Sequence, residues 1–520
     1  MDSIRAPRPP IFRFPHAEFR FSAGELAAAL LCAMLSILFG RQIAEQPVAA
    51  VAVAGLVALV YLLWRHPKYA LAVAMAGLVL IEEFELSSTE AYYESGLSKS
   101  VLAIRFFGVS FMDALTLLVL LPVLVREWLR WRETGVWRRS PLDGFFIPLV
   151  VVYALGAVQG VFNALNFSYF SWEARDLLYI MAWFFIATRT LETKRDVVGL
   201  LLVVFGTFSA KSLLFIYRVF AGKGLFYGFD FYRPALGSDV PMMAVPLITL
   251  IALVVLAPGA RRRVRVVALG LVAYWSVWFV GSLGRASYIS ATVALIVVFV
   301  LLWKRMRWTQ FLIPVAASLF GGLAYYYLVL TDVNRELVGG MIGSSVNWVD
   351  AVTVAQDLSI GQRIMEVMNV SETLTRAGAW LWGLGWGAPW SEIAVHHPID
   401  VASFEYSEAV RGVHTSAHID ALYFLLKVGI LGTLAIYLNY ARLAWTVMRQ
   451  FARERSIVIR IATVSLLVLI LIIIPNYVYF IKLKVLLGVA VGCVSLLMAR
   501  ADSDDDRGLD PAWLGPEEAR

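Results

Sequence analysis

PMMAVPLITLIALVVLA, residues 241–257, contains no charged side chain, and such stretches decide the fold class of this chain. IRIATVSLLVLILIII, residues 459–474, repeats the pattern with one arginine near its start. A helix of about 20 apolar residues crosses the hydrocarbon core of a bilayer, and it must be regular because lipid cannot satisfy unpaired backbone groups. Over all 520 residues, 60% are hydrophobic and 16% are charged, whereas soluble domains carry about 25% charge. The sequence therefore predicts an all-α polytopic membrane protein.

Fourteen segments of this kind are predicted to span the membrane. Their centres lie near Leu31, Gly55, Met75, Leu118, Val152, Trp183, Phe205, Ile248, Tyr274, Leu295, Ala317, Gly432, Leu467 and Gly488. They divide the chain into helices 1–11 (residues 1–330), a large outer loop (331–418), helices 12–14 (419–499) and an acidic tail (500–520) expected to be disordered. Two spans are less clearly marked, because 177–189 is short and only 476–484 separates the last pair.

Lysine and arginine residues set the predicted orientation, because they are retained on the cytoplasmic side of a membrane. If fourteen spans alternate, one side holds 29 of the 45 lysines and arginines. These lie in residues 1–23, 65–68, 126–139, 189–195, 261–265, 304–307 and 442–460 and in the tail from 500. Both termini are then expected in the cytoplasm. The net charge of +7 reflects these anchors, and no basic face with interleaved aromatic residues points to nucleic acid.

Arg285 is the most informative charge on the outer side. It lies in Gly281-Ser-Leu-Gly-Arg-Ala-Ser287, a short polar break between two spans. An arginine this close to hydrocarbon is costly unless it has an anionic partner or a water-filled cavity. The start of the next helix also offers backbone donors and the positive end of a helix dipole, which favour an anion. We therefore interpret Arg285 as an anion ligand, with snorkelling to lipid headgroups as the alternative.

Other outer-side cations are weaker candidates. Arg233 lies in Tyr232-Arg-Pro-Ala-Leu-Gly237, just before a span, and alone it is an ordinary loop arginine. Lys211 and Arg218 lie within or at the end of the preceding span, from which long basic side chains can snorkel outward. They remain secondary candidates.

The large loop holds His396, His397, His414 and His418, four of the six histidines. His414 and His418 have the i, i+4 spacing of helical zinc ligands, but no glutamate lies between them and the loop has no cysteine, so we predict no metal site. His418 directly precedes a span. It is the favoured general base, because the unperturbed pKa of histidine is close to neutral.

Aromatic residues are frequent in the same loop. Its tryptophans are Trp348, Trp380, Trp382, Trp386 and Trp390, and residues 360–375 have the pattern of an amphipathic helix. Tryptophan rings suit stacking on sugars, although anchoring at a membrane interface is their more frequent role. The loop is therefore predicted to be a folded unit with a function of its own.

The order of the outer-side motifs resembles that of the O-antigen ligase and O-antigen polymerase superfamily. Its members carry Ser-x-x-Arg between two spans, then a large periplasmic loop with an Arg, a Gly-x-Gly turn and a His before the next helix. The similar elements here are Ser282-Leu-Gly-Arg285, Gly361-Gln-Arg363, Gly383-Leu-Gly385, His418-Ile-Asp-Ala-Leu422 and Lys427-Val-Gly429-Ile-Leu-Gly432. Arg233 and Gly237 resemble an earlier Arg-x-x-x-Gly element, and the resemblance covers about residues 215–435. Ile419 stands where Asn is usual, and Lys427 where Glu is usual.

The resemblance implies a GT-C-type transmembrane glycosyltransferase in a bacterial inner membrane. It implies a polyprenyl-pyrophosphate-linked glycan as donor and a lipid or glycan as acceptor, in the assembly of lipopolysaccharide or exopolysaccharide. Arg285 and Arg233 would hold the two phosphates and stabilise the leaving group, and His418 would take the acceptor's proton. Further substrate ligands would be Arg218, Arg363 and Arg376. With arginines supplying the positive charge, no metal or other cofactor is expected, and direct attack would invert the anomeric centre.

Several alternatives stay open. Arg376 and Gly387 fit an Arg-x(10)-Gly spacing of the polymerases, but ligase and polymerase are not separated by the sequence. A secondary transporter would also carry intramembrane charges, together with an internal repeat and discontinuous helices. A metal-dependent GT-C enzyme would use an acidic pair on an early outer loop, for which Glu82-Glu-Phe-Glu85 is the candidate. A non-catalytic envelope-assembly protein would need none of these arginines near one another.

Overall fold

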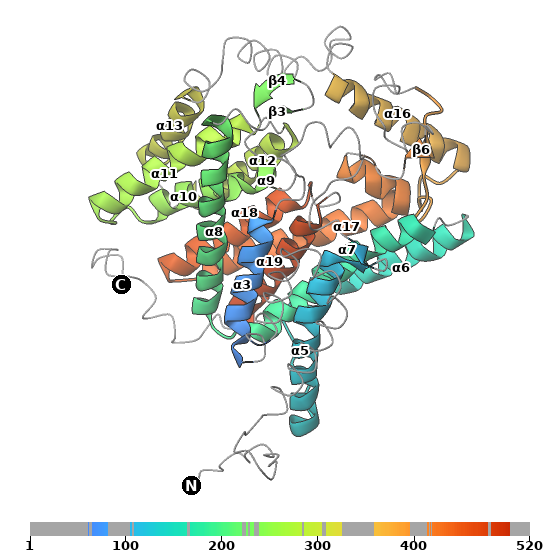
Figure 1. Cartoon of the computed structure of the whole chain (residues 1–520), viewed down its shortest axis with the longest axis horizontal. Coiled ribbons are helices and arrows are strands. Elements are labelled where there is room, and N and C mark those ends of the chain that lie inside the picture. The colour runs from blue at the N-terminus through green and yellow to red at the C-terminus, as the bar shows by residue number, and fades with distance from the viewer. Residues whose placement is uncertain are drawn as a thin grey trace, which may run out of the picture.

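The computed structural model describes residues 61, 65–81, 105–106, 109–163, 167–220, 225–226, 229–232, 239–282, 285–303, 308–324, 358–395, 413–414, 417, 419–476 and 480–499. Most of them are helical (Figure 1). The helices are α3 (Pro67–Leu80), α5 (Phe111–Thr134), α6 (Phe146–Phe162), α7 (Phe167–Thr190), α8 (Lys194–Phe220), α9 (Asp239–Met242), α10 (Ala244–Leu256), α11 (Arg262–Gly281), α12 (Arg285–Leu302), α13 (Trp308–Ala324), α16 (Leu358–Ala377), α17 (Asp420–Arg453), α18 (Ile457–Ile473) and α19 (Ile481–Ala499), with a 3₁₀ turn η2 at Asp143–Phe145. Three antiparallel strand pairs join β1 (Arg105–Phe106) to β2 (Val109–Ser110), β3 (Leu225–Phe226) to β4 (Phe229–Tyr232), and β5 (Trp390–Ser391) to β6 (Val413–His414).

The described helices are those of a membrane protein. Six apolar segments are long enough to cross a bilayer, namely Asp143–Phe162, Lys194–Tyr217, Asp239–Leu256, Arg262–Gly281, Asp420–Arg453 and Ile481–Ala499. The all-α membrane class expected from the composition is therefore confirmed. The predicted span centres from Met75 to Gly488 all lie within helices, whereas those near Leu31 and Gly55 lie outside the described residues. The total of fourteen spans stays a prediction.

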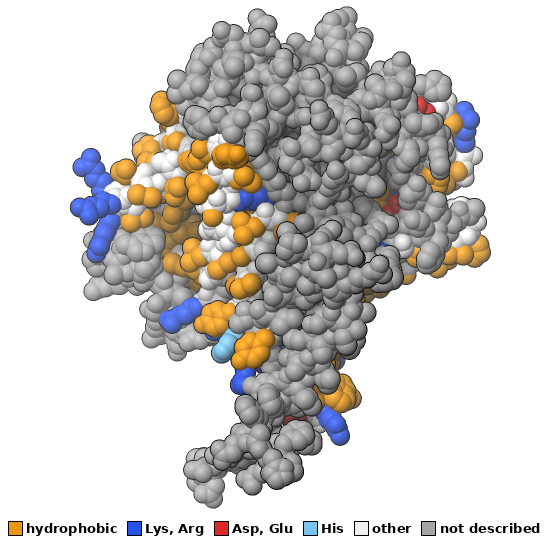
Figure 2. All heavy atoms as spheres, viewed as in Figure 1, with side chains coloured by type: hydrophobic (Ala, Val, Ile, Leu, Met, Phe, Trp, Pro, Cys, Tyr) orange, Lys and Arg blue, Asp and Glu red, His pale blue; other side chains and the backbone are white. Residues whose placement is uncertain are grey.

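The arrangement places α17, α18 and α19 between two groups of helices (Figure 1). Helices α10 to α13 gather on one side and α5 to α7 on the other (Figure 1). Apolar side chains cover much of the described surface, and Lys and Arg side chains gather at its edges (Figure 2). This distribution suits a body surrounded by lipid, because charged groups avoid the hydrocarbon.

Helix α7 is longer than its hydrophobic segment. It has 24 residues, Phe167–Thr190, whereas hydropathy marked only 177–189. The difference arises because its first turns carry Glu173, Arg175 and Asp176, which form ion pairs with neighbouring helices. A hydropathy window reads these side chains as the end of a span, although paired charges can be accommodated inside a bundle.

Helices α7 and α19 form a tightly packed parallel pair. Gly488 and Gly492 of α19 face α7, in the Gly-x-x-x-Gly spacing that lets two helix backbones approach closely. A Cβ on Gly488 would overlap the carbonyl group of Ile180, and a Cβ on Gly492 would lie 2.6 Å from the Cβ of Ala187. Because no larger side chain fits there, the two helices are held at a fixed distance.

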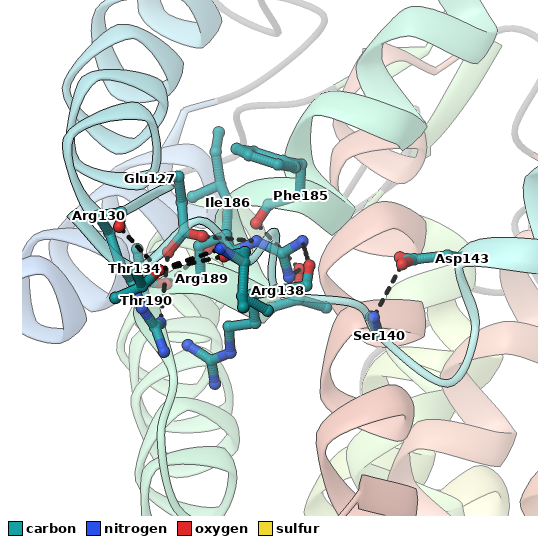
Figure 3. A network of polar contacts seen from close by, with 12 residues as sticks. Glu127, Arg130, Thr134, Arg138, Ser140, Asp143, Phe185, Ile186, Arg189 and Thr190 are labelled. Carbon is teal, nitrogen blue, oxygen red and sulfur yellow. Dashed lines mark hydrogen bonds and ion pairs between the residues drawn. The ribbon is translucent and has the colours of Figure 1, made fainter. Parts of the chain in front are cut away.

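One end of the bundle, which we call the basic end, is closed by ion pairs between segments far apart in the chain. Arg189 of α7 pairs with Glu127 of α5 at 3.5 Å and donates to the carbonyl oxygen of Arg138 (Figure 3). Lys194 of α8 pairs with Glu454, just after α17, at 3.0 Å. The basic segments 126–139, 189–195 and 442–460 therefore lie together, as helices of alternating direction require.

The opposite end, which we call the loop end, is where α5, α7, α17 and α19 begin. Helix α5 starts with a capping box, in which Ser110 and Asp113 each accept the backbone N–H of the other. Asp113 also pairs with Arg175 at 3.0 Å and accepts from the Tyr179 hydroxyl at 2.6 Å. The described part of the large loop, 358–395 with 413–414 and 417, contacts α17 and α6 at this end.

The orientation of the two ends can be tested by cysteine labelling. We expect a cysteine at the exposed Ala377 to react with an impermeant maleimide in cells with a permeabilised outer membrane, because the large loop is predicted to lie outside. Val136, 69% exposed near the basic end, is the matched control, and a cysteine there should react only after lysis. Both variants need Cys32 and Cys493 replaced by serine. The reverse labelling pattern would invert the proposed orientation.

Candidate functional site

Helix α17 is broken near its start. Gly429 has φ 65° and ψ −171°, which interrupts the helix between residues 428 and 430. The first part, residues 420–428, is nine residues long, and we call it the half-helix. Glycine is required at position 429 for two reasons. Its positive φ is unfavourable for other residues, and a Cβ there would overlap the backbone of Leu381.

The backbone groups released by this break are bonded by residues 378–388, which we call the glycine loop. The N–H groups of Leu384 and Gly385 donate to the carbonyl oxygens of Leu426 and Lys427, at 2.7 and 2.8 Å. In the other direction, the N–H groups of residues 430 and 431 donate to the carbonyl oxygens of residues 380 and 381, at 2.9 and 3.2 Å. The break is thus filled by backbone from the large loop, so that its irregular backbone groups are hydrogen-bonded within the protein, as they must be in a membrane protein.

The glycine loop also contacts α6. The N–H of Trp386 donates to the carbonyl oxygen of Gly156 at 3.0 Å, and its ring stacks on Tyr153 with centroids 4.4 Å apart. Gln159 donates to the carbonyl oxygen of Gly383 at 2.7 Å. Gly383, Gly385 and Gly387 all have positive φ. The Gly-x-Gly element and the Lys-x-Gly element, read separately in the sequence, therefore form one junction.

Glu173 of α7 joins the glycine loop to the half-helix. Its carboxylate pairs with the Lys427 ammonium at 2.6 Å and accepts from the N–H of Gly387 at 2.5 Å. Tyr423 donates a further hydrogen bond to Glu173, and Lys427 donates to the carbonyl oxygen of Ala388 at 2.7 Å. The Lys427 side chain is fully buried. We call this group, Glu173 with Tyr423, Lys427 and residues 387–388, the Glu173 clasp.

A second charged cluster lies where α8, α9 and α19 meet. The carboxylate of Asp239 accepts from Lys211 at 2.5 Å and from Lys482 at 2.9 Å, one lysine on each oxygen. Lys211 also donates to the carbonyl oxygen of Val79 at the end of α3, at 3.1 Å. All three charged side chains are buried. Lys211 therefore does not snorkel outward, as one reading of the sequence allowed, because its ammonium is directed into the bundle.

The Glu173 clasp and the Asp239 cluster are connected through α7 and α19. Asp176, one turn after Glu173, pairs with Lys484, and Lys484 is two residues from Lys482. Since α7 and α19 are locked together by Gly488 and Gly492, the two charged groups are held in a fixed relation. Such buried ionic groups are rare in membrane segments and commonly mark functional regions.

Of the predicted anion ligands Arg285, Arg218 and Arg233, the first two lie in described helices. Arg285 is the first residue of α12, as expected for the break after α11, and α12 packs against α9 and α18. Arg218 lies in α8, two turns beyond Lys211. Nothing is described of these two arginine side chains, and Arg233, six residues before Asp239, lies outside the described residues. Their convergence on one diphosphate stays a prediction.

Arg363 and Arg376 are described, and both lie on α16, which confirms the amphipathic helix predicted at 360–375. Arg376 is exposed and pairs with Glu372 at 2.8 Å. The two arginines are 13 residues apart on one helix, so they are separated by about 20 Å along its axis. They cannot therefore contact the same phosphate while α16 keeps this form.

The two histidines near the end of the large loop differ in their surroundings. His414 lies in strand β6, with its Nε2 2.8 Å from Glu392 and its ring stacked on Trp390 at 4.3 Å. The helical i, i+4 spacing that would suit a zinc site is therefore not formed at His414. His418 lies outside the described residues, between the buried Ala417 and the start of α17 at Asp420.

The tryptophans of the large loop are only partly available for sugars. Trp386 and Trp390 are buried in the core, and Trp380 donates to the Thr375 hydroxyl at 3.0 Å. Trp382 is 57% exposed, and Trp348 lies outside the described residues. Among the four that are described, Trp382 is thus the best placed to meet a ligand or the membrane surface.

Sequence reasoning did not identify Glu173, Asp176, Asp239, Lys482 and Lys484 as members of the site. The available signal was a set of charges at the edges of apolar segments, since Glu173 and Asp176 precede one span and Lys482 and Lys484 precede another. Hydropathy alone reads such charges as the ends of spans. The Gly488-x-x-x-Gly492 spacing, which predicts a close helix contact, was a further signal for the α7–α19 pair.

Comparison with the models of known protein families and with the curated proteins found no match to this chain.

Proposed function

We propose that this chain is a glycosyltransferase of the O-antigen ligase or polymerase type. It transfers a glycan from a polyprenyl-pyrophosphate carrier to a lipid or glycan acceptor at the outer face of a bacterial inner membrane. The observation that carries the proposal is the Asp239 cluster. Lys211 and Lys482 bring buried positive charge to a region bordered by α12, which starts with Arg285, and by the end of α8, which carries Arg218.

A diphosphate leaving group requires such a concentration of positive charge. Charge develops on its oxygen as the anomeric bond breaks, and fixed cations in a water-poor site stabilise that charge more than they do in water. Arg285 and Arg233 bind the phosphates through their planar guanidinium groups. The Asp239 cluster holds α8, α9 and α19 together.

The proposed transfer is a single displacement at the anomeric carbon. The acceptor hydroxyl oxygen attacks the anomeric carbon, the bond to the diphosphate oxygen breaks, and the polyprenyl pyrophosphate leaves with the electron pair. His418 takes the proton from the hydroxyl. Attack opposite the leaving group inverts the anomeric centre, and no metal takes part. The fold in this proposal is of the GT-C type, with about fourteen spans and with both termini in the cytoplasm.

Deletion of the gene, followed by profiling of surface polysaccharide, tests the proposed function. Short chains with a single repeat unit would identify a polymerase, whereas polymer left on the polyprenyl carrier would identify a ligase. A surface polysaccharide and a carrier pool that both match the parent strain would contradict the proposal.

Arg285→Lys should reduce glycan transfer about 10- to 100-fold, which corresponds to the loss of one charge-assisted hydrogen bond of roughly 1.5–3 kcal/mol. An ammonium keeps the charge but cannot reproduce the bidentate contact of a guanidinium. Arg175→Lys is the matched control, because Arg175 pairs with Asp113 at the same end of the bundle and should retain activity. Transfer at the parent rate in Arg285→Lys would instead favour snorkelling to lipid headgroups.

A secondary transporter is the second candidate, because α17 is discontinuous and the bundle contains buried ion pairs. In transporters the backbone groups at a helix break face the substrate or ion. Here the groups on both sides of Gly429 are bonded to the glycine loop. The break therefore gives less support to transport than its position alone would suggest. The acidic pair of a metal-dependent enzyme, Glu82 and Glu85, lies outside the described residues.

A further inference from the structure

The half-helix is not part of a continuous hydrogen-bonded helix with the rest of α17. A continuous helix transmits its orientation through i to i−4 hydrogen bonds, and Gly429 interrupts that series. The direction and rotation of residues 420–428 are therefore set by their contacts with other elements. The glycine loop fixes the end nearest the break, through the carbonyl oxygens of Leu426 and Lys427.

Rotation about the half-helix axis is restrained by Glu173. Tyr423 and Lys427 are four residues apart, so both project from one face of the half-helix. Both bond to the same carboxylate. That carboxylate also accepts the N–H of Gly387, which ties the half-helix to the glycine loop and to α7 at one point. The half-helix cannot turn without breaking buried, charged hydrogen bonds.

We infer that Glu173 is a positioning residue, which fixes the half-helix that begins two residues after His418, the proposed base. This inference rests on the proposed function for its catalytic part. Side chains extend about 5–6 Å from a helix axis, so a rotation of roughly 20° moves them by about 2 Å. A misplacement of about 1 Å can lower a rate 10²-fold.

Lys427 and Glu173 lie opposite each other as a buried ion pair. The polarity of the ion pair can therefore be reversed by Glu173→Lys together with Lys427→Glu. The reversed pair retains an ion pair across the same contact but loses the carboxylate that accepts from Gly387.

Hydrogen exchange measured by mass spectrometry on the full-length protein in nanodiscs gives a readout that does not depend on activity. In Glu173→Gln we expect the amides of 420–428 to exchange at least about tenfold faster, because their local opening is no longer opposed by the Glu173 clasp. The amides of the remainder of α17 should be unchanged. Arg175→Gln is the matched control, because it removes a neighbouring ion pair to α5 and should leave 420–428 unaffected.

Transfer kinetics test the positioning role. Glu173→Gln should lower kcat about 10²-fold with little change in the KM for the donor, and the reversed pair should recover part of both kcat and the exchange protection. Unchanged exchange in Glu173→Gln would overturn the inference. Faster exchange with an unchanged kcat would overturn the positioning role while leaving the proposed function intact. Absence of transfer by the unmodified chain would overturn both catalytic claims, and the exchange data would then describe a purely structural contact.

Discussion

His418→Ala is expected to lower glycan transfer by about 10²–10⁴-fold, the usual contribution of a positioned general base. The protein should still fold and insert. Transfer by the unmodified protein should fall as the pH drops through about 6–7, because protonated imidazole cannot accept a proton. The residual activity of His418→Ala should lack this dependence. Purified protein with a defined polyprenyl-pyrophosphate-linked glycan is the system in which to measure both.

His414→Ala is the control for that experiment. The ring of His414 stacks on Trp390 and its Nε2 lies beside Glu392, so it has a structural role in the β5–β6 pair. Its loss should weaken the loop locally and leave transfer near the parent rate. An inactive His414→Ala with an active His418→Ala would reassign the base. Loss of activity with a chelator would support the metal-dependent alternative.

Gly385→Ala is expected to disrupt the contact between the glycine loop and α17. The alanine Cβ would lie 2.7 Å from the carbonyl carbon of Gln159 and still closer to Gly160, so backbone must move. Displacement breaks the bonds from residues 384 and 385 to Leu426 and Lys427. Leaving two buried carbonyl oxygens unsatisfied costs about 2–6 kcal/mol. The thermal midpoint in detergent, followed by size-exclusion chromatography, should fall clearly below that of the parent protein.

Gly378→Ala separates packing from backbone strain. Gly378 also has a positive φ, 62°, but an added Cβ would meet nothing within 4 Å. Its substitution should cost only the strain of a left-handed conformation, about 1–2 kcal/mol. Equal losses of stability in the two variants would show that close packing of Gly385 against α6 contributes nothing.

The helices could be predicted from the sequence because lipid permits few alternatives to a regular apolar helix. Residues 241–257 and 459–474 fall in α9–α10 and α18 for this reason. The break at Gly429 could not be predicted in the same way. It depends on the partner that fills it, the glycine loop, which lies more than 40 residues earlier in the chain. Hydropathy averages over such a break and reports one continuous span.

The sequence motifs proposed for the candidate site are local, whereas the long-range ion pairs of the structure could not be predicted from the sequence. The order of Arg233, Arg285 and His418 could be read from the sequence because each motif is local. The contact of Lys482 with Asp239 joins residues 243 apart, and that of Lys211 with Asp239 joins residues 28 apart. No periodicity connects such positions. Only the folded arrangement of α8, α9 and α19 shows that they meet.

The junction at Gly429 has a consequence for how such proteins can diverge. Four backbone-to-backbone hydrogen bonds join the glycine loop to α17 on the two sides of this break. Leu381 contributes only its carbonyl oxygen, while its side chain is 55% exposed. Substitutions there can accumulate over evolutionary time without disturbing the junction, whereas Gly385 and Gly429 cannot change. Distant descendants of one ancestor would then share a spacing of glycines more than any run of matching side chains.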